Sequence, residues 1–215
     1  MNRAARAISD VDRRRIWTAL DAHSTAGDFI AIRGRAIATL VIDTGLRLSE
    51  LLALNIEQLV EDPTARAPRI LGTFDLRATQ AKNSKAASMA VPKRARDAIR
   101  VYLLELRRRE WIKAPPWRGP LWIVHKSRVQ GKHPRLSKRA AQTAWSTWQK
   151  RAGIHDPYRF HDLRHTAITR WADSTDNAFS VAELARHSDV KTSMRYVHGA
   201  PDRLREIAER ASRKT

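Results

Sequence analysis

Cysteine is absent from the sequence. The chain therefore cannot form a disulfide, ligate an iron–sulfur cluster or bind zinc through thiolates, and it has no cysteine nucleophile. Chains without disulfides are typical of the cytoplasm, so a cytoplasmic location is predicted, and no metal or other cofactor is expected.

Long apolar runs are absent as well. No stretch approaches the roughly 20 residues that a membrane-spanning helix needs, and the N-terminus lacks the apolar core of a signal peptide. Neither a membrane anchor nor a membrane partner is predicted.

Acidic residues are scarce relative to basic ones. Asp and Glu number 22 against 41 Lys and Arg, the formal net charge is +19, and the isoelectric point is about 11.3. Between Trp111 and His155 there are ten basic residues and no acidic one. Each phosphate that such a surface neutralises releases condensed counterions, so the composition predicts a nucleic-acid partner. A merely solvated basic surface is the alternative.

Hydrophobic periodicity predicts a mainly α (α+β) protein with a small antiparallel sheet. The length suits one domain or two small ones, and one compact domain is expected because no clear linker interrupts the chain. Helices are expected from residue 9 past 20, over about 30–43, over 48–54, from 92 past 106, over about 137–151, 161–172, 181–185, through Tyr196, and over 201–211. Strands are expected at 70–71, 74–79, 87–91 and 121–124.

Two arginines and a histidine have the chemistry to hold a phosphodiester. Attack on phosphorus adds charge to the non-bridging oxygens, and guanidinium groups match that geometry with paired hydrogen bonds. Arg47 follows the helix-ending Gly45, so its side chain can project from the next helix start. His161 and Arg164 are three residues apart and share a helical face. Taken singly, each has a plain alternative as a surface or core residue.

A possible nucleophile follows in Tyr196, nine residues after His187. The reference pKa of tyrosine is about 10, so attack at neutral pH needs cationic neighbours or a base. The alternative is that Tyr196 only packs in the core. Lys82 and Lys85 lie in a turn between two predicted strands, where either could donate a proton to a leaving oxygen or simply be solvated.

Four blocks in this order resemble one family. They are Thr-Gly-Leu-Arg-Leu-Ser-Glu-Leu at residues 44–51, Lys-Asn-Ser-Lys at 82–85 before a strand ending in Val-Pro, His-Asp-Leu-Arg-His-Thr at 161–166, and a histidine nine residues before a tyrosine. From about Ile8 to the C-terminus the chain is similar to the tyrosine recombinase (phage integrase) family, and the resemblance implies its catalytic-domain fold, a helical bundle with a small antiparallel sheet.

The resemblance also implies a site-specific DNA recombinase that needs neither metal nor ATP. Tyr196 would attack the scissile phosphate to give a 3′-phosphotyrosine and a free 5′-hydroxyl, while Arg47 and Arg164 clamp the phosphate oxygens. Religation to another strand's 5′-hydroxyl would recombine two duplexes in integration, excision, inversion, transposition or resolution, which the sequence does not distinguish.

The remaining roles follow from the same resemblance. Lys82 would be the general acid, His161 would act in proton transfer, and His187 would position the phosphate. One departure is Arg186, which stands where the family usually has glycine. Members usually carry an N-terminal DNA-binding domain of ~100 residues, whereas this chain is expected to be a single catalytic domain over residues 1–215, either a short recombinase or a fragment.

The implied partner is double-stranded DNA in the nucleoid. The resemblance implies a homotetramer on synapsed DNA, in which residues 201–211 dock onto a neighbouring subunit. Accessory DNA-bending proteins would be further partners. Two alternatives stay open, namely that residues 201–211 instead fold back onto their own subunit and that the protein is a monomer in solution. The competing functions are a catalytically silent DNA-binding regulator, a type IB topoisomerase-like nickase–ligase and a basic RNA-binding module.

Overall fold

The structure is a computed structural model that describes residues 6–80, 86–125, 133–175, 177–197 and 212. The chain forms two compact units, Met1–Ala167 and Ile168–Thr215, and each is described separately. The boundary between them falls inside helix α6 (Phe160–Ser174). Among the described residues no helix is both long and apolar enough to cross a bilayer. That the whole chain acts as one catalytic domain stays a prediction.

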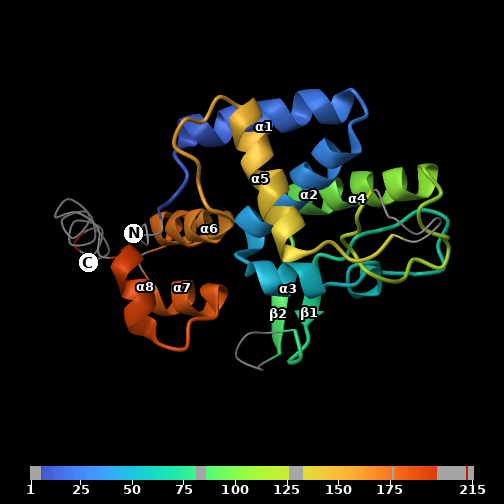
Figure 1. Ribbon diagram of the computed structural model, residues 1–215. Helices are drawn as coiled ribbons and strands as arrows, with labels where there is room; N and C mark the ends of the chain where they lie inside the picture. Colours follow the sequence, from blue (N-terminus) through green and yellow to red (C-terminus); the bar gives the residue numbers. More distant parts are fainter. Residues whose placement is uncertain (1–5, 81–85, 126–132, 176, 198–211, 213–215) are drawn as a thin grey trace. The chain divides into compact units, whose positions relative to one another are not determined.

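The larger unit is mainly helical, and a two-stranded sheet is formed by its described residues. Its elements before α6 are α1 (Asp10–Thr25), α2 (Phe29–Thr44), α3 (Leu48–Ala53), the 3-10 turn Ile56–Gln58, β1 (Thr73–Leu76), β2 (Ala87–Ala90), α4 (Lys93–Arg108) and α5 (Lys138–Arg151) (Figure 1). The prediction of a mainly α protein with a small antiparallel sheet is confirmed.

Local capping sets the helix ends that matter for the site. Asp28 caps α2 by accepting the backbone N–H of Ile30 at 2.8 Å. At the other end Gly45 takes a left-handed conformation, φ 61° and ψ 20°, and its N–H bonds back to the Val41 carbonyl. Glycine adopts this conformation at little steric cost, so α2 stops here and the chain turns sharply into Arg47 and α3.

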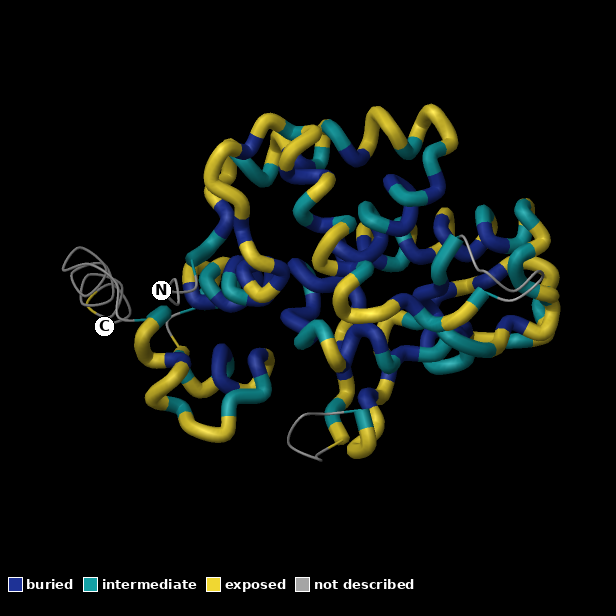
Figure 2. Tube along the Cα trace, viewed as in Figure 1, coloured by how far each residue is buried: buried dark blue, intermediate teal, exposed yellow. Residues whose placement is uncertain are grey.

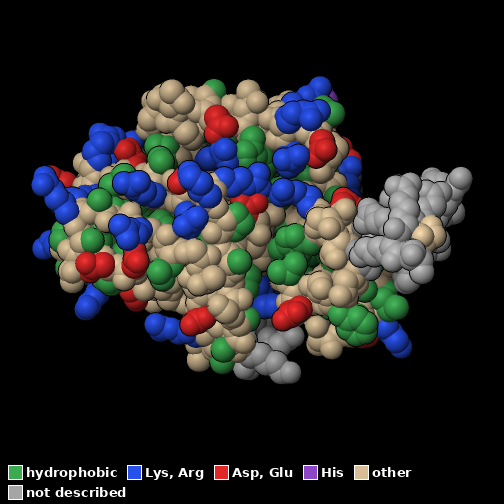
Figure 3. Space-filling model, turned by 180° about the vertical axis from the view of Figure 1, so that it is seen from behind, with side chains coloured by type: hydrophobic (Ala, Val, Ile, Leu, Met, Phe, Trp, Pro, Cys, Tyr) green, Lys and Arg blue, Asp and Glu red, His purple; other side chains and the backbone are tan. Residues whose placement is uncertain are grey.

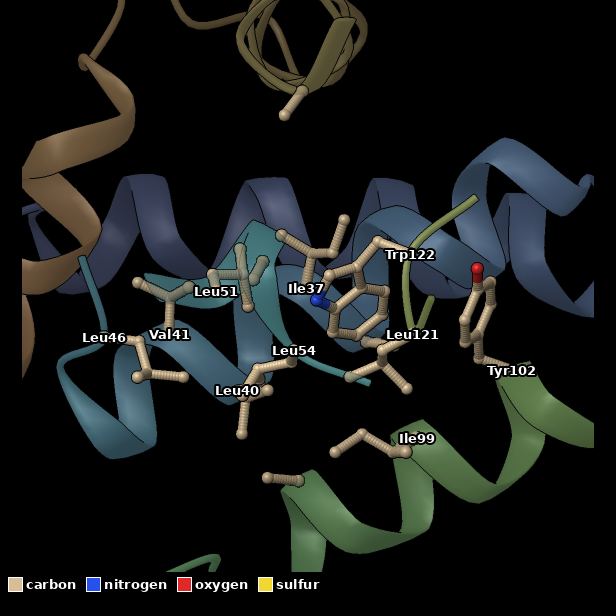
Figure 4. Packing of buried hydrophobic residues seen from close by; sticks show 14 of the residues in the cluster. Ile37, Leu40, Val41, Leu46, Leu51, Leu54, Ile99, Tyr102, Leu121 and Trp122 are labelled. Carbon is tan, nitrogen blue, oxygen red and sulfur yellow. The ribbon is translucent and has the colours of Figure 1, made fainter. Parts of the chain in front are cut away.

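The core of the larger unit surrounds α2. Twelve of its sixteen residues are buried, whereas α4 buries one face and leaves the other exposed (Figure 2). Figure 4 shows side chains from α2, α3, α4 and the segment before α5 meeting in this core, among them Ile37, Leu40, Val41, Leu51, Ile99, Tyr102, Leu121 and Trp122. The turn between α2 and α3 is therefore attached to a helix that is buried over most of its length.

The sheet is shorter than expected. β1 and β2 pair antiparallel, with Thr73 opposite Ala90 and Leu76 opposite Ala87, and the hairpin extends away from the helices below α3 in Figure 1. The expected strand at 70–71 is reduced to an isolated bridge between Val60 and Ile70.

The predicted strand at residues 121–124 is wrong. Ile123 forms only an isolated bridge to Arg135. Its N–H donates to the Tyr102 hydroxyl at 3.2 Å and its carbonyl accepts from the buried Arg33 at 2.6 Å. Side chains thus satisfy the Ile123 backbone, while on either side of it the Leu136 N–H donates to the Trp122 carbonyl at 2.7 Å and the Val124 N–H to the Pro134 carbonyl at 3.0 Å. The run is buried and paired at these points without forming a regular strand.

The smaller unit contains the end of α6, α7 (Ala178–Ala185) and α8 (Val190–Val197). Among its described residues the buried apolar centre comprises Ile168, Ala172, Val181 and Ala185, against which Trp171, Tyr196 and Val197 pack. The helix expected over residues 201–211 lies outside the described residues.

Candidate active site

Arg47 lies at the start of α3, where the sequence placed it. Its backbone N–H donates to Glu50 Oε2 at 2.9 Å, and its guanidinium Nη1 donates to Glu50 Oε1 at 2.9 Å. The Glu50 side chain is fully buried, while that of Arg47 is 20% exposed. One carboxylate therefore fixes the backbone and the side chain of Arg47 and leaves part of the guanidinium accessible.

Arg164 reaches the same turn from helix α6. It is 3% exposed, and its guanidinium donates to the Gly45 carbonyl, two residues before Arg47. The structure thus brings together two arginines that are 117 positions apart in the chain. Two guanidinium groups held at one turn are suited to the oxygens of one phosphate.

His161 stands on the first turn of the same helix and reaches the surface. Neighbouring protein removes part of its hydration and so lowers its pKa below the ordinary 6.5, the positive charge of Arg164 lowers it further, and Asp162 opposes the shift. The imidazole is consequently neutral at pH 7 and can accept or relay a proton.

Two carboxylates were missed by the sequence reasoning. Glu50 holds Arg47, and Asp162 holds the start of α6, because its Oδ2 accepts the backbone N–H of Arg159 at 2.7 Å. Asp162 is 3% exposed. Each lies three residues after the N–H that it accepts, which is the spacing of a capping box, so this signal was available in the sequence.

His187 and Tyr196 come together in the smaller unit. His187 Nδ1 lies 2.7 Å from the Oγ of the fully buried Ser193, and the His187 and Tyr196 rings are 6.5 Å apart between centroids. Tyr196 also packs against the apolar centre of the unit while staying half-buried. The core-packing alternative and a chemical role are therefore compatible, since packing orients the ring that carries the hydroxyl.

Arg186 makes the turn that leads into His187. It adopts the left-handed conformation, φ 53° and ψ 46°. Its N–H bonds to the Glu183 carbonyl at 3.0 Å and the His187 N–H to the Ala182 carbonyl at 2.9 Å. These two bonds form a Schellman motif, whose left-handed position normally holds glycine. The turn is therefore made despite the arginine, at a steric cost.

The six predicted site residues fall into three groups. Arg47, His161 and Arg164 belong to the larger unit, and His187 and Tyr196 belong to the smaller one. Lys82 and the alternative Lys85 lie outside the described residues, between the strands β1 and β2. Figure 3 shows that Lys and Arg side chains gather in a band on one face of the protein, as the net charge led us to expect.

Curated relatives are recombinases. The chain is 33% identical to the tyrosine recombinase XerC of Stutzerimonas stutzeri over 174 residues, which cover 80% of this chain and 50% of the relative. It is 29% identical to the tyrosine recombinase XerD of Corynebacterium glutamicum over 188 residues, covering 86% and 54%. The chain thus spans about half the length of these relatives.

Solved structures share the fold. The XerA recombinase aligns with a TM-score of 0.64 at 20% identity over 95% of this chain and 62% of its own. The catalytic domain of bacteriophage HP1 integrase aligns with a TM-score of 0.56 at 19% identity, over 96% of this chain and 95% of its own. The predicted catalytic-domain fold is confirmed.

The sequence matches the phage integrase family over residues 11–203. This span includes both arginines of the Gly45 turn, the first turn of α6 and the His187–Tyr196 pair. With the recombinase relatives and the shared fold, the match shows that the chain belongs to the phage integrase family.

Proposed function

We propose that this chain is a site-specific DNA recombinase that cleaves and rejoins strands through a 3′-phosphotyrosine at Tyr196. The observation that carries the proposal is the pair of guanidinium groups, Arg47 and Arg164, held at the Gly45 turn. A pentacovalent phosphorus transition state gains negative charge on its non-bridging oxygens, and fixed cations stabilise it without having to reorganise.

The reaction balances without a cofactor. The Tyr196 oxygen bonds to phosphorus as the bond to the 5′-oxygen breaks, and the phenolic proton leaves to a base or water. Lys82 protonates the departing 5′-oxygen to give a free hydroxyl. In the reverse direction a 5′-hydroxyl from another strand attacks the phosphotyrosine, so the energy of the phosphodiester is retained.

The two histidines have separate roles in this proposal. His161, neutral at pH 7 because its pKa is lowered, relays the proton at the phosphate. His187, whose Nδ1 lies 2.7 Å from the Ser193 hydroxyl oxygen, positions the phosphate by a hydrogen bond from its imidazole ring. In the proposed reaction, His161, His187 and Tyr196 all act on one phosphate.

The proposed partner is double-stranded DNA. A solved XerH recombinase is described as bound to its difH substrate in a post-cleavage complex, and the Tn1549 integrase as bound to circular intermediate DNA. For this chain we propose the same class of partner within the nucleoid, a homotetramer on synapsed DNA, and accessory DNA-bending proteins.

A covalent-capture experiment tests the activity. The protein is incubated with a library of nicked suicide duplexes whose central sequence is randomised, and adducts that survive denaturation are isolated and their DNA sequenced. Wild type should form an adduct, and Tyr196→Phe should form none. Tyr102→Phe is the matched control, because it removes the hydroxyl of another of the three tyrosines and should still form the adduct.

Each other outcome points elsewhere. A folded wild type that binds DNA but never forms an adduct would be a silent DNA-binding regulator. An adduct that persists in Tyr196→Phe would remove the nucleophile from the proposal. Adduct formation that never joins strands from two duplexes would favour a type IB topoisomerase-like nickase–ligase.

A further inference from the structure

The segment at residues 6–9, here called the N-terminal strap, lies against the region around the start of α6. The Ile8 N–H donates to the Thr166 hydroxyl oxygen at 2.8 Å in a buried position, and the Ser9 N–H donates to the Tyr158 hydroxyl at 3.4 Å. The Ile8 side chain is 4% exposed and belongs to the core of the larger unit. Two backbone hydrogen bonds and one core side chain thus hold the strap in place.

Arg6 secures the other end of the strap. Its Nη1 pairs with Asp156 Oδ2 at 2.7 Å and its Nη2 donates to the Asp156 carbonyl at 2.6 Å. The guanidinium also lies over the Tyr158 ring, 4.2 Å from its centroid. The Tyr158 hydroxyl in turn donates to Asp12 Oδ2 at 2.7 Å, which connects the strap to α1.

The strap is bonded to the helix that presents His161 and Arg164. Asp162, which lies between them, accepts the Arg6 N–H at 3.4 Å. The Thr166 hydroxyl accepts from the strap and at the same time donates to the Asp162 carbonyl at 2.7 Å. Both contacts fall on the first two turns of α6, so a shift of the strap moves the side chains on those turns.

We propose that the N-terminal strap is a positioning element for His161 and Arg164, with the Thr166 hydroxyl as its main attachment. The inference rests on the proposed recombinase function. The strap touches neither reacting group; it fixes the pose of α6 from one side, while the Gly45 carbonyl fixes Arg164 from the other. Misplacement of a catalytic group by about 1 Å costs up to ~100-fold in rate, so loss of the strap slows cleavage.

A set of threonine variants tests the attachment in the full chain. Thr166→Val keeps the shape but leaves the buried Ile8 N–H without an acceptor, and Thr166→Ser restores the hydroxyl. Thr147→Val is the matched control, because Thr147 makes the same bond to the carbonyl four residues earlier, at 2.9 Å, on α5. Single-turnover cleavage at saturating protein, DNA affinity and thermal stability are measured for each.

Thr166→Val should cleave about tenfold more slowly or worse at unchanged affinity, whereas Thr166→Ser and Thr147→Val should cleave at nearly the wild-type rate. Arg6→Ala should also slow cleavage, and its effect should not add to that of Thr166→Val, because either change releases the strap. Arg151→Ala is its charge-matched control, since Arg151 also pairs with an aspartate, Asp28, and lies over an aromatic ring, Trp148.

A folded Thr166→Val protein that cleaves at the wild-type rate would overturn the strap proposal and leave the recombinase proposal intact. If wild type formed no adduct at all, the recombinase proposal would fail instead. In that case the strap proposal is tested independently of cleavage, by an NMR titration of His161. Release of the first turn should bring its pKa back toward 6.5 in Thr166→Val but not in Thr147→Val, and an unchanged pKa overturns the positioning role.

Discussion

Replacing Glu50 by glutamine tests whether the placement of Arg47 matters for catalysis. The carboxylate is fully buried and accepts two bonds from Arg47, at 2.9 Å each, one from the backbone and one from the guanidinium. Glutamine preserves the shape and keeps one acceptor oxygen. Its amide NH2 must then face an N–H donor of Arg47, so one bond and the charge attraction are lost.

The size of the effect follows from that geometry. A hydrogen bond to a charged group contributes about 1.5–3 kcal/mol, and one of the two bonds is lost. If the loss is expressed fully in the transition state, cleavage slows by about 10- to 160-fold at about 1.36 kcal/mol per factor of ten. Any part of this lost bond energy that already destabilises the folded protein before the reaction does not slow cleavage and appears instead as a lower free energy of unfolding.

Two assays separate these contributions: urea unfolding, and single-turnover cleavage of a suicide duplex selected by the covalent capture. Glu105→Gln is the matched control, because that carboxylate is 12% exposed and is bonded to Arg108, the last residue of α4, and to Arg109, which caps it. The control should lose stability at an unchanged cleavage rate. A Glu50→Gln protein that is folded and cleaves as fast as wild type would refute the positioning of Arg47 by Glu50.

The other predictions concern the turn before His187 and the charge state of α6. Arg186→Gly should be about 1 kcal/mol more stable than Arg186→Ala in urea unfolding, because only glycine avoids the left-handed strain; equal stability would contradict the strain. In the folded protein the pKa values of His161 and His165 are lowered, so as the pH falls the unfolded chain takes up protons at a higher pH than the folded one. The free energy of unfolding should therefore decrease as the pH drops below about 6.5. The decrease should be less steep in a His161→Gln/His165→Gln protein. Asp162→Asn removes a negative charge that raises the pKa of His161, so an NMR titration should show that pKa lowered further. The acidic side of the curve of cleavage rate against pH should then move to lower pH. If that side of the curve does not move, His161 takes no part in the rate-limiting proton transfer.

Much of the fold was predictable because it depends on short-range patterns. The end of α2 at Gly45 and the start of α3 at Arg47 follow from residues within four positions of each other. The spacing of Glu50 from Arg47 and of Asp162 from Arg159 carried the capping signal as well, although the sequence reasoning did not use it. Hydrogen bonds across three or four residues are available to a helix end wherever it lies in the fold.

The failed strand at residues 121–124 marks the limit of such patterns. Its apolar run indicated burial correctly, since Leu121 to Ile123 are all buried. Periodicity could not show that the Ile123 backbone would be satisfied by the side chains of Arg33 and Tyr102, which are 90 and 21 positions away. Hydrophobicity predicts burial, but the partner of a buried N–H depends on which elements pack beside it.

The site shows the same division. The sequence by itself indicated which residue types could perform phosphoryl transfer and placed three of them, Arg47, His161 and Arg164, near the starts of helices. Only the tertiary structure decided that Arg164 reaches the Gly45 carbonyl across 119 positions and that Ile8 bonds to Thr166 across 158. These bonds form because packing in the larger unit brings segments that are far apart in the sequence into contact, and no local spacing encodes a contact of that range.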